Sequence, residues 1–203
     1  PPAYDRQGVS VDDLIDFTPE LRAEALERVS KFGMGPIFTP PVAADPDGSY
    51  GTLMLPSTGG GTNWPGGSVD PETGVFYQYS FTQMVSLGLV NDPERSDMDF
   101  IRGNPAGVRA RDRALTIRGL PMVKPPWGRI SAIDLKTGDI LWQVAHGETP
   151  DNVREHPDLQ GVDIPRTGRI GRVGTLITKT LVIAGEPGVF TTPSGERGAM
   201  LRA

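Results

Sequence analysis

The pattern Asp-x-x-Thr-Gly followed by an aromatic residue occurs twice in this chain and limits the folds that it can adopt. The two copies are Asp70-x-x-Thr73-Gly74-x-x-Tyr77 and Asp134-x-x-Thr137-Gly138-x-x-x-Trp142. Asp, Thr and Gly are typical of the tight turns that join two antiparallel strands. A third copy is expected to begin at residues 201–203. Repeated hairpins of this kind indicate an all-β protein built as a sandwich, a barrel or a propeller, and the repeat favours the propeller.

The composition agrees with a turn-rich, ordered protein. Among 203 residues there are 26 Gly and 20 Pro, while hydrophobic residues make up 37%, which is too high for a disordered chain. The formal net charge is -5, so no nucleic-acid partner is expected. Cysteine is absent, which excludes a disulfide framework and a thiolate metal site.

Nothing in the sequence predicts a membrane-spanning helix, because no apolar run reaches about 18 residues. The chain begins at Pro1 without a signal-peptide pattern. We interpret it as a processed chain or as a section of a longer one.

Residues 1–36 carry the one clear helical pattern, and we predict a helical insertion or lead-in there. Thr18 can cap the helix, Pro19 suits its first position, and the end is expected near Lys31-Phe32 because glycines and a proline follow. The apolar residues at near-helical spacing are Leu14, Phe17, Leu21, Ala25 and Val29, with Leu26 beside them. This pattern predicts a short surface helix packed on something larger.

Residues 37–203 are predicted to form a partial β-propeller with a loop insertion near 81–126. Strands are expected at 50–55 and 75–79, and a hairpin is expected over 128–147. Three more short strands are expected after residue 172. The segment 81–126 is rich in charge and has no clear period, which favours a long loop.

The glycine-rich stretch 59–68, "GGGTNWPGGS", is the least generic part of the sequence. It nearly fits the phosphate-binding loop G-x-x-x-x-G-K-[ST], but Gly67 stands where that loop needs lysine. A turn follows instead of the helix whose N–H groups would hold the phosphates. The stretch therefore argues against a nucleotide.

At these residues the chain resembles the quinoprotein dehydrogenases, eight-bladed propellers that use pyrroloquinoline quinone (PQQ). Ala132-x-Asp134-x-x-Thr137-Gly138-x-x-x-Trp142 is similar to the tryptophan-docking motif of that family. Residues 51–80 resemble the blade that carries a Gly-Gly-x-Asn-Trp loop into the cofactor site, and residues 127–148 resemble the following blade. Residues 172–188 and 199–203 resemble the blade after that. Residues 4–26 are similar to an insertion in the membrane-bound glucose and quinate dehydrogenase branch.

The resemblance implies a section of about two to three blades with a short N-terminal helix, and it assigns the glycine-rich loop to the cofactor. Glycines let the loop approach a flat ring system closely, and the Asn63 amide can donate to or accept from a quinone carbonyl or a ring carboxylate. Trp64 is either a second cofactor-binding residue or an aromatic that packs between blades. Trp142 is expected to be structural, as a docking residue between blades.

The implied activity is that of a PQQ-dependent dehydrogenase in the intact parent protein. That enzyme would oxidise a sugar, polyol or alcohol and pass electrons to a membrane quinone. The Ca²⁺ ligands and the catalytic aspartate are expected upstream of this chain, so the chain on its own is expected to be inactive. We expect it in the periplasm, attached to the inner membrane by a segment outside this chain, with self-association through open sheet edges.

Two other interpretations remain open at this point. A non-catalytic propeller of the kind that scaffolds outer-membrane protein assembly would share the turns and Trp142, but it would not need the Asn63-Trp64 loop. A structural section that binds nothing would be indifferent to PQQ.

The remaining polar residues are interpreted without a catalytic or metal-binding role. His146 and His156 are expected to be solvent-exposed turn residues, because a metal site needs three or four convergent ligands. Arg166, Arg169 and Arg172 recur at every third position and could bind an anion, but a solvated edge is the expected interpretation.

Overall fold

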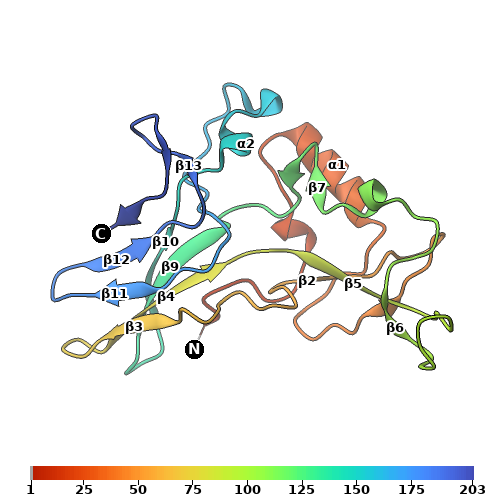
Figure 1. Ribbon diagram of the computed structural model, residues 1–203, viewed down its shortest axis with the longest axis horizontal. Helices are drawn as coiled ribbons and strands as arrows, with labels where there is room; N and C mark the ends of the chain where they lie inside the picture. The colour runs from red at the N-terminus through yellow and green to blue at the C-terminus, as the bar shows by residue number, and fades with distance from the viewer. Residues whose placement is uncertain (1) are drawn as a thin grey trace. The chain divides into compact units, whose positions relative to one another are not determined.

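The computed structural model describes residues 2–203, whose regular structure consists mainly of short β-strands (Figure 1). The residues group into two compact units. Unit 1 comprises residues 2–5, 59–83 and 125–203, and unit 2 comprises residues 6–58 and 84–124. Each unit is described by itself.

Unit 1 is built on a four-stranded antiparallel sheet with the order β10-β9-β4-β3. Its strands are β3 (Gly67–Asp70), β4 (Val75–Phe81), β9 (Gly128–Asp134) and β10 (Ile140–Ala145). The expected hairpins are therefore present, but they lie in one sheet rather than in successive blades. The cause is the pairing of β4 with β9 over seven residues, from Val75 opposite Asp134 to Phe81 opposite Gly128. This pairing joins segments far apart in the sequence, which the local turn pattern does not reveal.

Both Asp-x-x-Thr-Gly turns close as predicted. The Glu72 N–H donates to Asp70 Oδ1 at 2.9 Å, and the Thr73 hydroxyl donates to Asp70 Oδ2 at 2.7 Å. These two bonds, the hydroxyl first, hold the pKa of Asp70 below its usual range. In the second turn the Lys136 N–H donates to Asp134 Oδ1 at 2.7 Å. The glycine that ends each turn has a left-handed backbone, with φ of 75° and 80°.

The aromatic residues after the turns meet within the sheet. Tyr77 and Trp142 both lie opposite Ala132, and their ring centroids are 5.7 Å apart. Ala132 is fully buried beneath them, and its small side chain leaves room for the two rings. Trp142 was expected to dock between blades. In residues 2–203 its ring partner is Tyr77 of its own sheet, and 41% of Trp142 is exposed.

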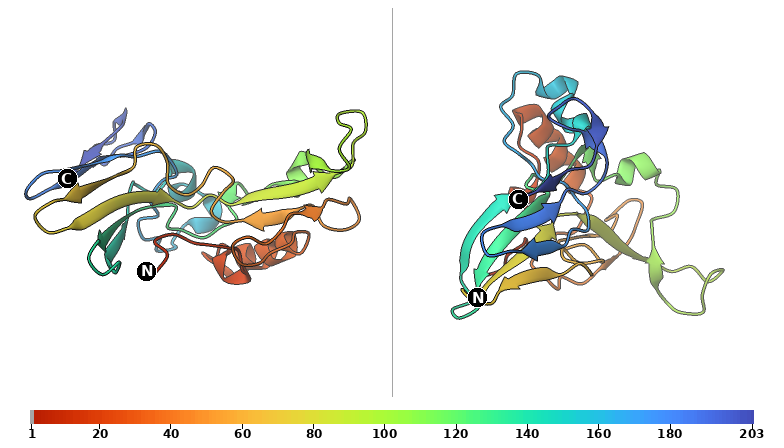
Figure 2. Two further views of the ribbon diagram at one scale, coloured as in Figure 1. Left: turned by 90° about the horizontal axis from the view of Figure 1, so that it is seen from below. Right: turned by 60° about the vertical axis from the view of Figure 1, so that its left-hand side comes forward.

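A second sheet of unit 1 packs on the first (Figure 2). Its order is β11-β12-β15, with β11 (Thr175–Ile177), β12 (Val182–Gly185) and β15 (Leu201–Arg202). The strands expected after residue 172 are thus present, together with the hairpin of β13 (Phe190–Thr191) and β14 (Arg197–Gly198). Two short helical pieces, α2 (Asp151–Arg154) and a 3-10 turn (Pro157–Leu159), lie in the connection between the two sheets.

The two sheets share a hydrophobic core and a polar contact. Tyr79, Phe81 and Ile130 of the first sheet pack with Val173 and with Ala184 of β12. On the β3 side, the Ser68 hydroxyl donates to the Thr175 carbonyl, and the Thr175 hydroxyl donates to the Tyr77 carbonyl at 3.1 Å. β3 and β11, each the first strand of its sheet in chain order, therefore lie next to each other.

Unit 2 contains the predicted helix. α1 (Pro19–Val29) is capped by Thr18, whose hydroxyl oxygen accepts from the Leu21 N–H at 3.3 Å, and a 3-10 turn (Val11–Asp13) precedes it. Leu21, Ala25 and Val29 are buried as the periodicity predicts, whereas Leu26 is 41% exposed. The helix ends two residues before the expected Lys31, because Ser30 already forms its C-cap.

The prediction that residues 81–126 form a long loop is wrong. This segment supplies β5 (Val85–Val90), which pairs with β1 (Val42–Ala43), β2 (Thr52–Met54) and β6 (Ile101–Gly103). It also contains a 3-10 turn (Ala110–Arg113) and the hairpin of β7 (Thr116–Ile117) and β8 (Leu120–Pro121). The sequence did not predict β5, because its partners are distant and because Gly88 interrupts its apolar pattern. A Cβ at Gly88 would lie 2.9 Å from Ala44 Cβ and from the Gly103 carbonyl, so the close packing of these strands requires glycine.

No helix within residues 2–203 has the length and apolar character that a bilayer crossing needs.

Candidate functional site

The glycine-rich loop folds into a tight turn that presents Asn63 and Trp64 side by side. The Gly66 N–H donates to the Asn63 carbonyl at 2.9 Å, and Asn63 Oδ1 accepts from the Trp64 N–H at 2.8 Å. Gly60 and Gly66 have φ of 82° and 62°, a left-handed backbone that glycine adopts without strain.

Three hydrogen bonds fix this loop to unit 1. The Phe81 N–H donates to the Gly61 carbonyl at 2.8 Å, and Gln78 Nε2 donates to the Gly66 carbonyl at 3.3 Å. The hydroxyls of Tyr4 and Thr62 are 3.0 Å apart. The loop is therefore held at both ends by the sheet that carries it.

Close packing explains another glycine of the loop. A Cβ on Gly67 would lie 2.5 Å from the Phe76 ring. The left-handed backbone of the turn therefore explains why Gly60 and Gly66 are glycines, and close packing on the neighbouring strand explains Gly67. The expectation that the glycines admit a ligand is not needed at these three positions.

The side chains of Asn63 and Trp64 are available for a ligand. Asn63 Oδ1 is occupied by the turn, while its Nδ2 amide has no hydrogen-bond partner among residues 2–203. Trp64 is 96% exposed, so it does not fill core space in the described part of the chain. An amide donor and an uncovered indole face therefore lie next to each other.

The segment just before β11 passes close to this loop. Gly174 lies against Pro65, because a Cβ on Gly174 would come within 3.2 Å of Pro65 Cβ. Arg172, two residues earlier, is exposed and has no hydrogen-bond or ion-pair partner among residues 2–203. This cation thus lies two residues along the chain from the contact of Gly174 with Pro65.

The three arginines at every third position do not form one solvated edge, so that expectation is wrong for Arg169. The side chain of Arg169 is only 13% exposed, and its guanidinium carbon lies 4.2 Å from the centroid of the Phe190 ring. Its burial lowers the pKa of Arg169, against the charges of Asp151 and Glu186. Arg166 is exposed and pairs with Glu148 at 3.4 Å. A charge spacing in an irregular segment does not show which residue turns inward.

His146 is buried, which corrects the expectation of an exposed turn residue. It is 5% exposed, its Nε2 lies 2.9 Å from the Gly185 carbonyl, and its ring centroid is 5.7 Å from that of Tyr79. Burial lowers the pKa of His146 and favours the neutral imidazole, with the Gly185 carbonyl and Glu186 opposing it. The same expectation is wrong for His156, whose side chain is only 14% exposed. Its Nδ1 accepts from the Asp158 N–H at 3.2 Å and so caps the following 3-10 turn. Within residues 2–203 no group of three His, Asp or Glu residues converges in a way that could hold a metal ion.

Comparisons with known proteins show the family of this chain. The family model described as "PQQ: Glucose/ethanol/alcohol dehydrogenase, beta-propeller domain" matches residues 1–196. Quinoprotein glucose dehydrogenase A of Acinetobacter calcoaceticus is 29% identical over 149 residues, which cover 68% of this chain and 18% of that protein. The quinate/shikimate dehydrogenase (quinone) of Acinetobacter baylyi is 29% identical over 119 residues, or 49% of this chain and 14% of that protein.

A third relative differs in its named substrate. The glycerol dehydrogenase large subunit of Gluconobacter thailandicus is 29% identical over 166 residues, or 62% of this chain and 21% of that protein. The chain thus spans between 14% and 21% of the length of these three relatives. Because the family match runs over nearly all of its residues, the chain belongs to the β-propeller domain family of the PQQ-type glucose, ethanol and alcohol dehydrogenases.

Proposed function

We propose that this chain is the section of a PQQ-dependent dehydrogenase that presents the Gly59–Gly67 loop to the cofactor. The observation that carries the proposal is the anchored turn, in which Asn63 Nδ2 has no hydrogen-bond partner among residues 2–203 and lies beside the exposed Trp64 indole. The relatives named for glucose, quinate and glycerol support a sugar, polyol or alcohol as the substrate of the intact parent enzyme.

The side chains at the loop fit a flat, anionic quinone. Asn63 Nδ2 can donate to a carbonyl or carboxylate oxygen, and the Trp64 indole can cover one face of a planar ring. The Arg172 guanidinium can pair with a carboxylate. When bound, PQQ supplies a carbonyl that accepts two electrons from the substrate.

The residues of this chain would then have positioning roles. Asn63 would donate its amide N–H to an oxygen of the cofactor, and Trp64 would shield the cofactor from water. The hydrogen bonds from Phe81 and Gln78 keep the turn in place, so these contacts are prearranged before binding. A fixed turn costs less ordering entropy on binding than a mobile one.

The rest of the reaction is assigned to parts of the parent outside residues 1–203. We place the Ca²⁺ ligands and the catalytic aspartate there, so that this chain alone is inactive. We also place the membrane attachment there, with a membrane quinone as electron acceptor and the propeller in the periplasm. In this account residues 1–36 are a lead-in, and residues 37–203 are the partial propeller.

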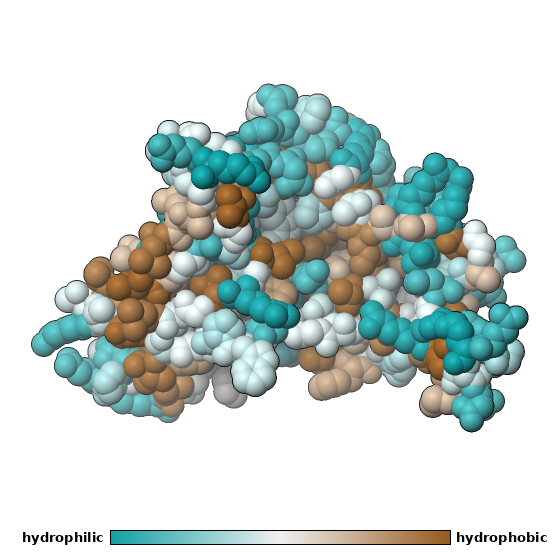
Figure 3. Space-filling view, viewed as in Figure 1, coloured by the Kyte–Doolittle hydropathy of each residue, from teal (hydrophilic) through white to brown (hydrophobic). Residues whose placement is uncertain are grey.

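Self-association through open sheet edges is part of the same proposal for the isolated chain. Apolar residues gather over the end of unit 1 where β3, β11 and β12 lie (Figure 3). Leu176, Leu181 and Leu201 are 60%, 47% and 73% exposed. Edge strands with such residues favour pairing with another chain.

Replacing Asn63 tests the cofactor role. We expect Asn63→Ala to weaken the binding of PQQ to the chain by about tenfold, because one hydrogen bond to a charged group contributes about 1.5–3 kcal/mol. Equilibrium dialysis of PQQ, with and without Ca²⁺, measures the affinity. Asn152→Ala is the matched control, since Asn152 is an exposed asparagine in the connection between the sheets.

Two results would count against the proposal. If wild type and Asn63→Ala bind PQQ with equal affinity, Asn63 does not contact the cofactor. Wild-type chain that binds no PQQ at any attainable concentration would favour the non-catalytic scaffold, which shares the turns but has no use for the loop.

A further inference from the structure

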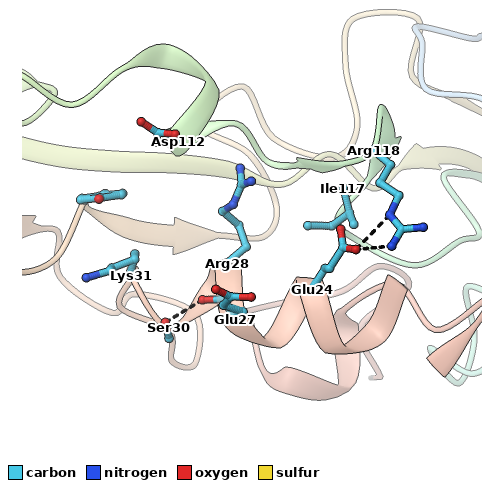
Figure 4. A pocket seen from close by; sticks show the side chains of 9 residues that line it. Glu24, Glu27, Arg28, Ser30, Lys31, Asp112, Ile117 and Arg118 are labelled. Atoms are coloured by element: carbon cyan, nitrogen blue, oxygen red, sulfur yellow. Dashed lines mark hydrogen bonds and ion pairs between the residues drawn. The ribbon is translucent and has the colours of Figure 1, made fainter. Parts of the chain in front are cut away.

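Unit 2 contains a pocket of about 610 Å³ that the proposed cofactor role does not use. It lies between α1 and the β7–β8 hairpin, and Figure 4 shows side chains of both elements facing it. Glu24, Glu27 and Arg28 line it from one face of the helix, as their spacing of three and four residues requires. Lys31 and Tyr50 line it further along, and its volume lies within the range of small-molecule sites.

Two guanidinium groups at this pocket are held in fixed positions. Arg28 Nη1 donates to the carbonyls of Arg111 and Ala114, at 3.0 Å each. Arg118 Nε donates to Glu24 Oε1 at 2.9 Å, and Arg118 Nη2 donates to the same oxygen (Figure 4). Asp112, across from Arg28 in this view, is paired with Arg109 at 3.0 Å.

The backbone at Arg118 is unusual for its residue type. Arg118 has φ of 50° and Gly119 has φ of 90°, so the two residues form the left-handed turn between β7 and β8. Asparagine or glycine fits the first position of such a turn with less strain than arginine. This turn holds the Arg118 side chain at the rim of the pocket, where it neutralises Glu24.

Three polar groups of the pocket are uncommitted. The Lys31 ammonium, the Glu27 carboxylate and the Tyr50 hydroxyl have no hydrogen-bond or ion-pair partner among residues 2–203. Glu24 and Asp112 are already neutralised by arginines, and Arg28 has used only one of its nitrogens. The groups that remain available to a ligand therefore carry a net positive charge. The Glu27 carboxylate and the Tyr50 hydroxyl can form further hydrogen bonds with that ligand.

We propose that this pocket binds a small carboxylate that carries several hydroxyl groups. Lys31 and Arg28 are suited to the carboxylate, because charge-assisted bonds to an ammonium and a guanidinium are the strongest available there. Glu27 and Tyr50 accept from or donate to hydroxyls. A bare inorganic anion would supply no hydroxyl groups to Glu27 and Tyr50, and a neutral polyol would supply no counter-charge to Lys31 and Arg28.

Calorimetric titration of the full chain with sodium D-gluconate tests this proposal. D-glucose provides the hydroxyls without the carboxylate, and acetate provides the carboxylate without the hydroxyls. We expect saturable gluconate binding with Kd of about 1 mM or tighter, and at least about tenfold weaker binding of each of the other two. Lys31→Met is expected to weaken gluconate binding about tenfold, since it removes a charge-assisted bond. Lys179→Met, an exposed lysine of unit 1, is the matched control.

Each contrary outcome overturns a defined part of the proposal. If glucose binds as tightly as gluconate, the pocket does not recognise the carboxylate. If acetate binds as tightly as gluconate, the pocket does not recognise the hydroxyl groups. Unchanged affinity in Lys31→Met, with unchanged melting temperature, would place any binding elsewhere. Absence of saturable binding up to about 10 mM would overturn the site altogether. The pocket shares no residue with the Gly59–Gly67 loop, so this test and the PQQ test fail independently.

Discussion

Phe190→Ala is expected to lower the free energy of unfolding of this chain by about 3–5 kcal/mol, the usual cost of deleting a buried phenylalanine ring. Phe190 is 1% exposed, at the start of the β13–β14 hairpin. The substitution leaves a cavity in unit 1 that the short hairpin cannot fill.

Loss of the Phe190 ring also removes an aromatic contact of the Arg169 guanidinium. The guanidinium lies 4.2 Å from the ring centroid, and its nearest acid, Asp151, is 3.8 Å away. Arg169 Nε and Nη2 are buried and have no hydrogen-bond partner among residues 2–203. Contact with an aromatic face stabilises a cation by about 0.5–2 kcal/mol, so its loss adds to the cost of the cavity.

Urea unfolding of the purified chain measures this effect. Phe190→Leu keeps most of the volume and is expected to cost less than about 1.5 kcal/mol. Val189→Ala is the neighbouring control, because Val189 is 58% exposed and surface changes usually stay within about 0.5 kcal/mol. A Phe190→Ala chain within about 1 kcal/mol of wild type would show that the hairpin does not pack as described.

Gly128→Ala is the second change with a large expected effect, about 2–3 kcal/mol of destabilisation. A Cβ on Gly128 would lie 2.2 Å from the Arg169 carbonyl oxygen and 2.8 Å from the Tyr79 hydroxyl. Neither atom can move freely. The Arg169 N–H donates to the His146 carbonyl at 3.0 Å, and the Tyr79 hydroxyl donates to the Arg169 carbonyl.

Gly185→Ala provides the control for Gly128→Ala. Gly185 ends β12, has no heavy atom within 4 Å of an added Cβ, and needs no left-handed backbone. Its substitution is expected to change stability by less than about 0.5 kcal/mol. Equal unfolding midpoints for the two variants would contradict the close crossing of residues 167–169 over the ends of β9 and β10.

The sequence predicted the parts of the fold that depend on neighbours along the chain. The capped helix at Thr18 and the two Asp-x-x-Thr-Gly turns follow from side chains that bond to backbone two or three residues away. Each of these bonds is visible in a short window of sequence.

Parts that depend on distant partners could not be predicted. The pairing of β4 with β9 and the placing of β5 between β1 and β2 join segments separated by tens of residues. β4 and β9 were each predicted as strands, but their sequences do not show which strand pairs with which. The apolar pattern of β5 is short and interrupted by Gly88, so it did not distinguish a strand from a loop. A repeated turn was therefore assigned to successive blades when it closes two hairpins of one sheet.

For the candidate site, the sequence indicated Asn63 and Trp64 through a resemblance, and the structure adds their arrangement. The resemblance could not show that Asn63 Oδ1 is occupied by the Trp64 N–H, which leaves only the amide nitrogen for a ligand. It also left the state of Trp64 open between packing and exposure. The pocket between α1 and the β7–β8 hairpin had no sequence signal, because Lys31, Tyr50 and Arg118 come from three separate segments.

A PQQ titration in the presence of Ca²⁺, monitored by ¹⁵N NMR of the three tryptophan indole N–H groups, shows whether the cofactor meets the loop at Trp64. Trp64 is 96% exposed on the loop, Trp142 is 41% exposed on β10, and Trp127 is 1% exposed. Trp64→Phe assigns the loop signal. We expect a saturable shift of the Trp64 signal, with the Trp127 and Trp142 signals unchanged. A Trp64 signal that stays in place while PQQ binds, or three signals that move together, would contradict this expectation.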